Sequence, residues 1–365
     1  MLAGCPDNIE RQNGCCAVHV TIDEIAIPNS LDDGSAGAAF TEMTHVRNAV
    51  EAAVVGSDDL APTPPELLAG WLNAYEPRRL FVARVEGTIV GRGVYEVQLE
   101  EGVASAWLTV EVLPSHRQHG IGEALHERLM RLARHEGRTI VQVFAMHRAD
   151  AGGDTLPSPT GFGAVPSGDD GVRFLLARGY RLAQVERMSR LDLPVRVIVP
   201  DAPEGYELEQ WDGPTPAHRL DDLAALHAQM STDAPAGDLD VTPEIWDGDR
   251  VLAADERELG GGRRLLTAAV RHRASDTLVG FTQLSVPPEQ ERPINQNDTI
   301  VASGHRGHRL GMFLKAANLA RLETEAPGHP SVYTWNAEEN RHMLRVNEAV
   351  GFVAVGLEGG WRREL

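Results

Sequence analysis

Two short basic turns in this sequence carry the residue types that bind phosphate. Their residues are Arg117, Gln118, His119, Gly120, Ile121 and Gly122 in the first, and Arg306, Gly307, His308, Arg309, Leu310 and Gly311 in the second. Each turn precedes apolar positions of helical period, so its backbone N–H groups lie unpaired at a helix start. The helix dipole makes such a place attractive to an anion. We therefore predict two phosphate-binding sites, the first phosphate turn (residues 117–122) and the second phosphate turn (residues 306–311).

Two other glycine-rich motifs do not fit the first phosphate turn. A dinucleotide-binding loop needs G-x-G-x-x-G, and the register here differs. A P-loop needs G-K-[ST] at the helix start, whereas Gly122 is followed by Glu123 and Ala124. The alternative that stays open is a basic surface turn closed by two glycines.

A strand must precede the first phosphate turn, and a helix must follow it. Leu108, Val110 and Val112 alternate with polar or partly polar neighbours, which is the period of a strand with one buried face. Pro114 ends that strand because it cannot donate a ladder hydrogen bond. The apolar stripe that begins at Ile121 then indicates a helix.

Strand, R-x-x-G-x-G and helix in this order resemble the signature of the GNAT superfamily of N-acetyltransferases. The second phosphate turn lies 189 residues after the first and aligns with it without a gap, although Arg309 replaces Gly120. A repeat at that spacing indicates two whole domains. The resemblance to a tandem GNAT protein covers nearly all of residues 16–365. It implies an α+β fold of two domains, each a mixed, mostly antiparallel sheet flanked by helices.

The domain boundaries follow from composition. We expect a disordered leader at residues 1–15, an N-terminal GNAT-like domain at 16–193, a proline-rich linker at 194–205 and a C-terminal GNAT-like domain at 206–365. Between its phosphate turn and its last helix, the first domain carries about 17 more residues than the second. This extra length falls in the Gly- and Pro-rich loop 149–171, which is either a tolerated insertion or a lid.

Periodicity places the remaining elements. In the N-terminal domain we expect strands at 18–27, 80–85, 89–98, 138–146 and 184–193, with helices at 37–56, 64–75 and 172–178. In the C-terminal domain we expect strands at 206–211, 264–271, 277–286, 332–336 and 352–365, helices at 217–230 and 340–349, and the phosphate-turn strand and helix within 298–324.

Composition limits the partners. With 53 acidic and 34 basic residues, the net charge of -19 argues against nucleic acid and favours a cationic small molecule, such as an amine. A hydrophobic content of 42% without an apolar run near ~18 residues predicts a soluble protein with no membrane span. Lysine occurs once, at Lys315, which we attribute to genomic base composition. The sequence does not distinguish a monomer from a homodimer.

Cysteine and histidine usage excludes other classes of site. Cys5, Cys15 and Cys16 all fall in the first 16 residues, so we expect no disulfide framework, thiolate metal site or cysteine nucleophile in the folded part of either domain. H-x-x-H occurs at both phosphate turns, but it lacks a clear third ligand, so we expect no metal. No secretory signal pattern begins the chain, which favours a cytoplasmic protein.

The resemblance implies acetyl-CoA as the cofactor. Beside the two phosphate turns, the positions that match the family's cofactor contacts are Val110, Val112, Val301, Met312, Asn336 and Asn340. Asn340 is equally suited to cap a helix. The family's general base is often a carboxylate near the turn strand, which points to Glu111 and Asp298. Leu175 and Asn347 occupy the position of the family's thiolate-protonating tyrosine.

These residues favour catalysis in the C-terminal domain. Asn347 can donate a hydrogen bond to sulfur, whereas Leu175 cannot. We expect direct attack of an amine on the thioester in a ternary complex, with Asp298, Asn347 and Glu111 as catalytic candidates. Two alternatives stay open. One is acetylation of a cysteinyl conjugate, as in mycothiol synthase, another tandem member; the other is a decayed protein that only binds or senses acyl-CoA.

Overall fold

The computed structural model describes residues 7–9, 19–148 and 153–365. The three cysteines and most of the expected leader lie outside these residues. Residues 7–9, which we expected to be disordered, instead form β1 (Asp7–Ile9), whose backbone pairs antiparallel with β2. That ladder satisfies backbone hydrogen-bonding groups that a disordered leader would leave to water.

The N-terminal half follows the expected order. Its further elements are β2 (Val20–Ile25), α1 (Gly34–Val55), α2 (Pro64–Trp71), β3 (Arg78–Val85), β4 (Thr88–Glu96), β5 (Ser105–Val112), α3 (Ile121–His135), β6 (Ile140–His147), β7 (Thr155–Pro157), β8 (Ala164–Pro166), α4 (Asp170–Ala177) and β9 (Arg181–Asp192). The described part of loop 149–171 contains the hairpin of β7 and β8, which the sequence pattern did not indicate.

The C-terminal half repeats that order without the hairpin. Its elements are β10 (Tyr206–Asp212), α5 (Leu220–Asp233), α6 (Gly248–Leu259), β11 (Arg264–His272), β12 (Thr277–Val286), β13 (Ile294–Val301), α7 (Leu310–Glu325), β14 (Ser331–Ala337), α8 (Arg341–Val350) and β15 (Val353–Glu364). β13 starts four residues earlier than expected, and α6 was not anticipated. The α+β fold with mixed, mostly antiparallel pairing is confirmed.

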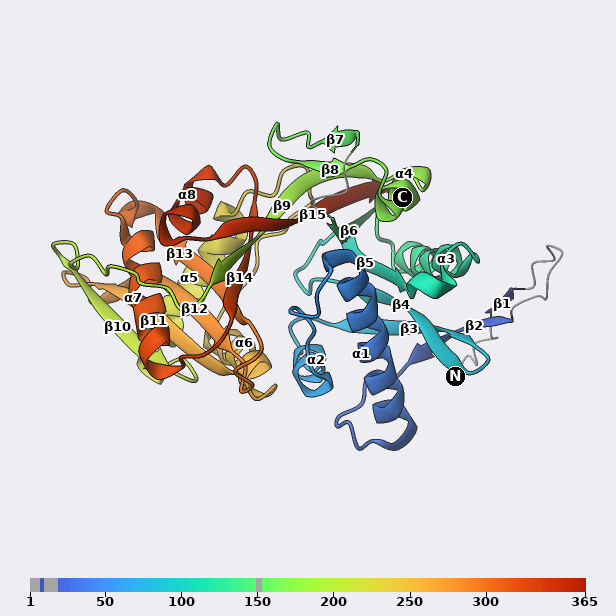
Figure 1. Cartoon of the computed structure of the whole chain (residues 1–365), viewed down its shortest axis with the longest axis horizontal. Coiled ribbons are helices and arrows are strands. Elements are labelled where there is room, and N and C mark those ends of the chain that lie inside the picture. The colour runs from blue at the N-terminus through green and yellow to red at the C-terminus, as the bar shows by residue number, and fades with distance from the viewer. Residues whose placement is uncertain (1–6, 10–18, 149–152) are drawn as a thin grey trace.

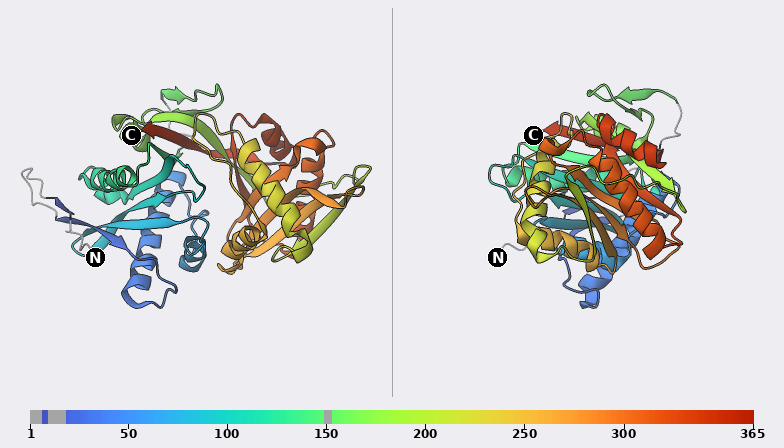
Figure 2. Two further views of the ribbon diagram at one scale, coloured as in Figure 1. Left: turned by 180° about the vertical axis from the view of Figure 1, so that it is seen from behind. Right: turned by 90° about the vertical axis from the view of Figure 1, so that its left-hand side faces the viewer.

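The two halves share one sheet by exchanging their last strands. β15, the last strand of the chain, inserts between β6 and β9 of the N-terminal half, and β9 pairs in turn with β14. In Figure 1, β15 runs out of the C-terminal half, and the chain ends inside the other half. The left view in Figure 2 shows the two halves as separate lobes joined by these strands. Each half is therefore completed by a strand of the other.

In each half, two parallel strands pair at one end and then separate. β5 pairs with β6 only from Ser105 to Trp107, and β13 pairs with β14 only at Ile294 and Asn295. Beyond those positions each pair diverges and opens the sheet. The phosphate turns follow at the divergent ends of β5 and β13.

Ion pairs hold the halves together away from the shared sheet. Glu66, which is also the N3 residue of the α2 capping box, binds Arg263 at 2.9 Å and Arg292 at 2.7 Å from the C-terminal half. These arginines lower the pKa of Glu66 to about 2, against the opposing effect of its burial. A buried carboxylate with two cationic partners fixes how α2 sits on the C-terminal half.

The α5–α6 loop (residues 234–247) reaches from the C-terminal half across the sheet of the N-terminal half. Gln142 of β6 donates to the Asp240 carbonyl at 2.9 Å and accepts from its N–H at 2.6 Å. Gln184 of β9 donates to the Pro235 carbonyl at 2.6 Å.

None of the helices within the described residues is long and apolar enough to cross a bilayer.

Candidate active site

A large cavity lies where the splayed strands of the C-terminal half meet the α5–α6 loop and the N-terminal half. Its volume is about 1380 Å³. Every residue of the second phosphate turn except His308 lines it, as do Asn297, Asp298, Asn336 and Asn340. Of residues 108–125, all of which the structure describes, none lines it. The cavity thus belongs to the second phosphate turn.

The second phosphate turn keeps the backbone shape of the first despite its different glycines. Gly307 and Arg309 have φ of 87° and 58°, and the matching Gln118 and Gly120 have φ of 63° and 79°. The second and fourth residues of each turn thus have left-handed backbone conformations. The glycine is the fourth residue of the first turn (Gly120) and the second residue of the second turn (Gly307). Arg309 therefore does not distort the turn, and it adds a cation at this position.

The guanidinium of each turn is held in the same way. Arg306 Nε donates to the Val301 carbonyl at 3.1 Å, and Arg117 Nε donates to the Val112 carbonyl at 3.2 Å. Arg306 also binds the Asp233 carboxylate at 2.6 Å, and half of its side chain is exposed. Both arginines are thus positioned by the strand that precedes them.

The two turns differ in the space beside their last glycine, which is Gly122 in the first turn and Gly311 in the second. A Cβ on Gly122 would lie 3.4 Å from the ring of Phe174, which comes from α4. The guanidinium of Arg178 stacks on that ring at 3.6 Å from its centroid. At Gly311 the same direction is open to at least 4 Å. The first phosphate turn is covered by a side chain, and the second faces the cavity.

β13 carries a bulge that β5 lacks. Gln296 pairs with Leu284 and Thr299 pairs with Thr282, so two residues of β13, Asn297 and Asp298, lie opposite the single residue Gln283 of β12. The register between β4 and β5 is unbroken from Val112 to Trp107. A bulge leaves one residue outside the ladder and redirects side chains, here at Asn297 and Asp298. The strand beside the cavity is therefore locally reshaped.

The side chain of Gln296 stabilises this bulge through hydrogen bonds. Its Nε2 donates to the Gln283 carbonyl at 2.7 Å and to Thr282 Oγ1 at 2.9 Å, and it lies 3.3 Å from the Asn297 carbonyl. Thr282 and Thr299 add a hydroxyl hydrogen bond of 2.7 Å across the strands. The acceptors left by the broken ladder thus find donors, as buried polar groups must.

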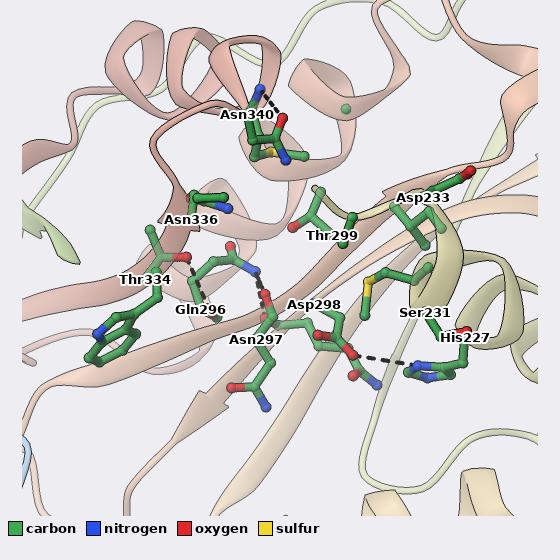
Figure 3. Close-up of a pocket in the computed structure, with 18 of the residues that line it drawn as sticks. His227, Ser231, Asp233, Gln296, Asn297, Asp298, Thr299, Thr334, Asn336 and Asn340 are labelled. Carbon is green, nitrogen blue, oxygen red and sulfur yellow. Dashed lines mark hydrogen bonds and ion pairs between the residues drawn. The ribbon is translucent and has the colours of Figure 1, made fainter. Parts of the chain in front are cut away.

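Asp298, one of the expected catalytic residues, projects from the bulge into the cavity beside a histidine. Its Oδ2 lies 3.4 Å from Nδ1 of His227 on α5, as the dashed line in Figure 3 shows. Burial raises the pKa of Asp298 above its usual value, against the attraction of Arg257. Burial lowers the pKa of His227 to about 4, so its imidazole is neutral at pH 7. A carboxylate with raised basicity beside a neutral imidazole is suited to accept a proton.

Packing fixes the orientation of His227. Its ring stacks on Trp246 at 4.2 Å between centroids, with an interplanar angle of 12°, and lies 4.9 Å from Phe281. Its Nδ1 is buried without a hydrogen-bond partner among the described residues. His227 was not among the residues that we expected at the site. The signal was its place in the apolar stripe of Leu223, His227 and Met230, where a polar side chain is unexpected.

Of the three asparagines expected at the site, two line the cavity and one is buried behind it. Asn336 lines the cavity, and Asn347 Nδ2 donates to its Oδ1 at 2.6 Å. Asn347 is only 1% exposed and is not among the residues that line the cavity, so it orients Asn336. Asn340 lines the cavity and also caps α8, accepting from the Met343 N–H at 3.2 Å. Figure 3 shows Asn336 and Asn340 at the end of the cavity away from His227.

The N-terminal candidate carboxylate is engaged elsewhere. Glu111 forms an ion pair with Arg92, whose side chain is 8% exposed. Val110 and Val112 of the same strand pack into the apolar core of the N-terminal half. The side chains of these three expected site residues contact packed protein in this structure.

The N-terminal half nevertheless contributes a wall to the cavity. Trp107 of β5 and Phe144 of β6 stack at 4.9 Å and 3°, and both line the cavity. Glu186 of β9 also lines it, and burial raises its pKa to about 7, with the neighbouring Glu339 adding to the shift. The site is therefore built by both halves, with the phosphate end in the C-terminal one.

Comparisons with known proteins give one family match and several similar structures. Residues 50–151 match the model of the acetyltransferase (GNAT) family. A tandem GNAT protein from the clavulanic acid biosynthesis pathway has a similar structure, with 24% identity and a TM-score of 0.70 over 94% of this chain and 98% of that one. A GCN5-related N-acetyltransferase from Sphaerobacter thermophilus has 16% identity and a TM-score of 0.62 over 94% and 95%.

A third similar structure is a GCN5-related glucosamine N-acetyltransferase region of a fungal multi-domain GH3 β-N-acetylglucosaminidase. It has 16% identity and a TM-score of 0.59 over 96% of this chain and 39% of that one. No curated protein matches the sequence. Residues 50–151 thus match the GNAT acetyltransferase family model, and 94% of the chain has the fold of a tandem GNAT protein. The family match covers the first phosphate turn, whereas the cavity lies at the second.

Proposed function

We propose that the chain is an acetyl-CoA-dependent N-acetyltransferase whose site is in the C-terminal half. The observation that carries the proposal is the continuous cavity of about 1380 Å³ that joins the second phosphate turn to Asp298 on the β13 bulge. A pyrophosphate held at the turn and a proton acceptor at Asp298 would then share one cavity, as acetyl transfer to an amine requires.

The residues around the cavity fit acetyl-CoA. Backbone N–H groups of residues 307–311, with Arg306 and Arg309, would hold the pyrophosphate, and the open face of Gly311 leaves room for it. Asn336 and Asn340 would contact the pantetheine arm. Bound there, acetyl-CoA supplies an activated acyl group as a thioester.

The chain's own residues would then prepare the acceptor. Asp298 takes a proton from the incoming ammonium, and the neutral imidazole of His227 lies beside that carboxylate. Carboxylates that line the cavity, such as Asp298 and Glu186, favour a cationic amine over an anionic acceptor. The amine attacks directly, because the cavity wall offers no cysteine among its described residues. The N-terminal half would act as a structural partner and as the far wall.

Calorimetric titration of acetyl-CoA tests where the cofactor binds. We expect one site, weakened about tenfold by Arg306→Gln and less than twofold by Arg117→Gln, because a charge-assisted hydrogen bond to phosphate is lost only in the first case. The two variants are matched, since both arginines are held by a strand carbonyl. One site lost only with Arg117→Gln would move the function to the N-terminal half.

A turnover assay separates an enzyme from a sensor. Release of free CoA is followed with a panel of primary amines, including a cysteinyl conjugate to test the mycothiol-type alternative. Binding without turnover of any acceptor favours the acyl-CoA-sensing alternative, and no binding rejects both readings.

A further inference from the structure

Lys315, the only lysine in the 365 residues, lies inside the candidate site. It is on α7, one turn beyond Gly311, with 1% of its surface exposed, and it lines the same cavity as the second phosphate turn and Asp298. The chain carries 34 basic residues in all, and the others are arginines. A single lysine at this place differs from an arginine in one chemical respect: its amine can lose a proton and act as a nucleophile.

The ammonium group of Lys315 has no polar partner among the described residues. Its Nζ lies 5.8 Å from the ring centroid of Phe352, with no hydrogen bond or ion pair to any described side chain. The matching position in the N-terminal half is His126, whose Nε2 lies 3.1 Å from the hydroxyl of Tyr180. Tyr180 in turn matches Phe352, so the partner present in one half is missing in the other.

This environment favours the neutral amine. Burial lowers the pKa of Lys315 to about 7, with no compensating charge nearby. A buried cation without a partner is costly, and a lysine lowers that cost by losing its proton. Near neutral pH about half of the molecules would therefore carry a nucleophilic amine in the cavity, whereas an exposed lysine is almost entirely protonated.

We propose that Lys315 is a site of self-acetylation, at which the protein accepts an acetyl group from acetyl-CoA bound at the second phosphate turn. The inference rests on the proposed function, because it needs acetyl-CoA in the same cavity. Its geometric basis is that the phosphate turn, the β13 bulge and the Lys315 side chain line one space.

The chemistry is a simple transfer. Nζ of Lys315 attacks the thioester carbonyl carbon with its lone pair, and a C–N bond forms as the C–S bond breaks. The electron pair of the broken bond goes to sulfur, and the proton released by the nitrogen ends on the thiolate. The products are an ε-N-acetyl-lysine and free CoA, with no oxidant or other reactant required.

Mass spectrometry of the wild-type protein tests the proposal without a substitution. The full-length protein is incubated with acetyl-CoA, and its tryptic peptides are compared with those of an untreated sample. Because trypsin does not cleave after acetyl-lysine, modification creates the peptide of residues 310–321, which carries one added acetyl group. That peptide is expected to appear, and the same incubation in excess CoA or with Arg306→Gln should form it at least fivefold more slowly.

The pH dependence distinguishes the buried amine from ordinary chemical acetylation. With a pKa of about 7, the initial rate should rise about tenfold from pH 6 to pH 8 and then level off. A lysine with an unperturbed pKa would give about a hundredfold rise over the same range. A hundredfold rise, or an equal rate in denatured protein, would overturn the proposal.

The outcome for Lys315 is separable from that of the proposed function. Binding of acetyl-CoA at the second phosphate turn with no acetylation of Lys315 rejects self-acetylation and leaves the proposed function intact. Failure to bind acetyl-CoA rejects both.

Discussion

Nδ1 of His227 lies 3.4 Å from Oδ2 of Asp298, and these two side chains come from different layers of the C-terminal half. Asp298 is on the bulged strand β13, and His227 is on α5, which packs against the sheet. The pair lies in the cavity that also holds the second phosphate turn. Proton transfer and cofactor binding would thus both take place beside the same short stretch of β13.

Replacing Asp298 tests its role as the proton acceptor. Asp298→Asn keeps the shape of the side chain but removes its basicity, so we expect kcat to fall about 10²- to 10³-fold. Affinity for acetyl-CoA should change less than twofold, because the phosphate turn is untouched. Steady-state kinetics with the best amine, together with calorimetry, measures both quantities.

The matched control is Glu111→Gln in the N-terminal half. It leaves Arg92 without its partner, so it should lower stability while changing kcat less than threefold. If Glu111→Gln abolished turnover and Asp298→Asn did not, the assignment of the site to the C-terminal half would be wrong.

The bulge on β13 gives a second prediction. Gln296→Met removes the donor that serves the Gln283 and Asn297 carbonyls, and the bulge should straighten or loosen. We expect kcat to fall about 10- to 100-fold, because an error of about 1 Å in a catalytic group has an effect of that size. Amide hydrogen exchange at residues 296–299 should increase in parallel. A normal kcat with altered exchange would show that the bulge is not needed for turnover.

Buried histidines predict how stability depends on pH. Burial lowers the pKa of both His227 and His126 to about 4, below the usual value of 6.5. The unfolded chain therefore binds protons first as the pH falls from 6.5 to 4, and stability is lost across that window. Through this linkage, each histidine accounts for up to about 3 kcal/mol of the free energy of unfolding that is lost between pH 6.5 and pH 4.

His227→Phe isolates one of these contributions. The substitution keeps a ring against Trp246, and the variant should lose about 2 kcal/mol less than the wild type between pH 7 and pH 4. Urea unfolding at the two pH values gives the comparison. An identical loss in both proteins would mean that His227 is not held neutral.

The local pattern of the sequence was sufficient for most of the fold and for part of the site. The alternation from Leu108 to Val112 and the stripe from Ile121 onward identified a strand and a helix, because each face of these elements meets one environment. Asp298 was found because it lies beside the phosphate turn along the chain. These features depend on neighbours within a few residues.

Features that depend on distant partners were not predictable in this way. Val353–Glu364 reads as a strand, but nothing in it says that its neighbours are β6 and β9. The bulge at Asn297 arises from a register difference against β12, and His227 reaches the site because of how α5 packs. Lys315 was read as compositional bias, since its burial and its missing partner appear only when α7 and Phe352 are placed together.

A pair of carboxylates in the shared sheet gives the last prediction. Glu358 of β15 and Glu186 of β9 are direct neighbours in the register. Burial raises the pKa of Glu358 to about 8, and the nearby Glu186 and Glu51 add to the shift. The pKa of Glu186 is raised to about 7. Both folded values lie above the unfolded value of 4.5, so the native state binds more protons and loses stability as the pH rises from 4.5 to 8.

Glu358→Gln should therefore stabilise the protein at high pH alone. The amide keeps the size of the side chain and removes the like-charge repulsion, so the free energy of unfolding should increase by about 2 kcal/mol at pH 8.5 and by less than about 0.5 kcal/mol at pH 4.5. Glu364→Gln, an exposed carboxylate of the same strand, is the control and should change neither value by more than about 0.5 kcal/mol. Equal stabilisation by Glu358→Gln at both pH values would point to packing instead of charge. Relief of charge repulsion is expected only at the pH at which the two carboxyls are ionised.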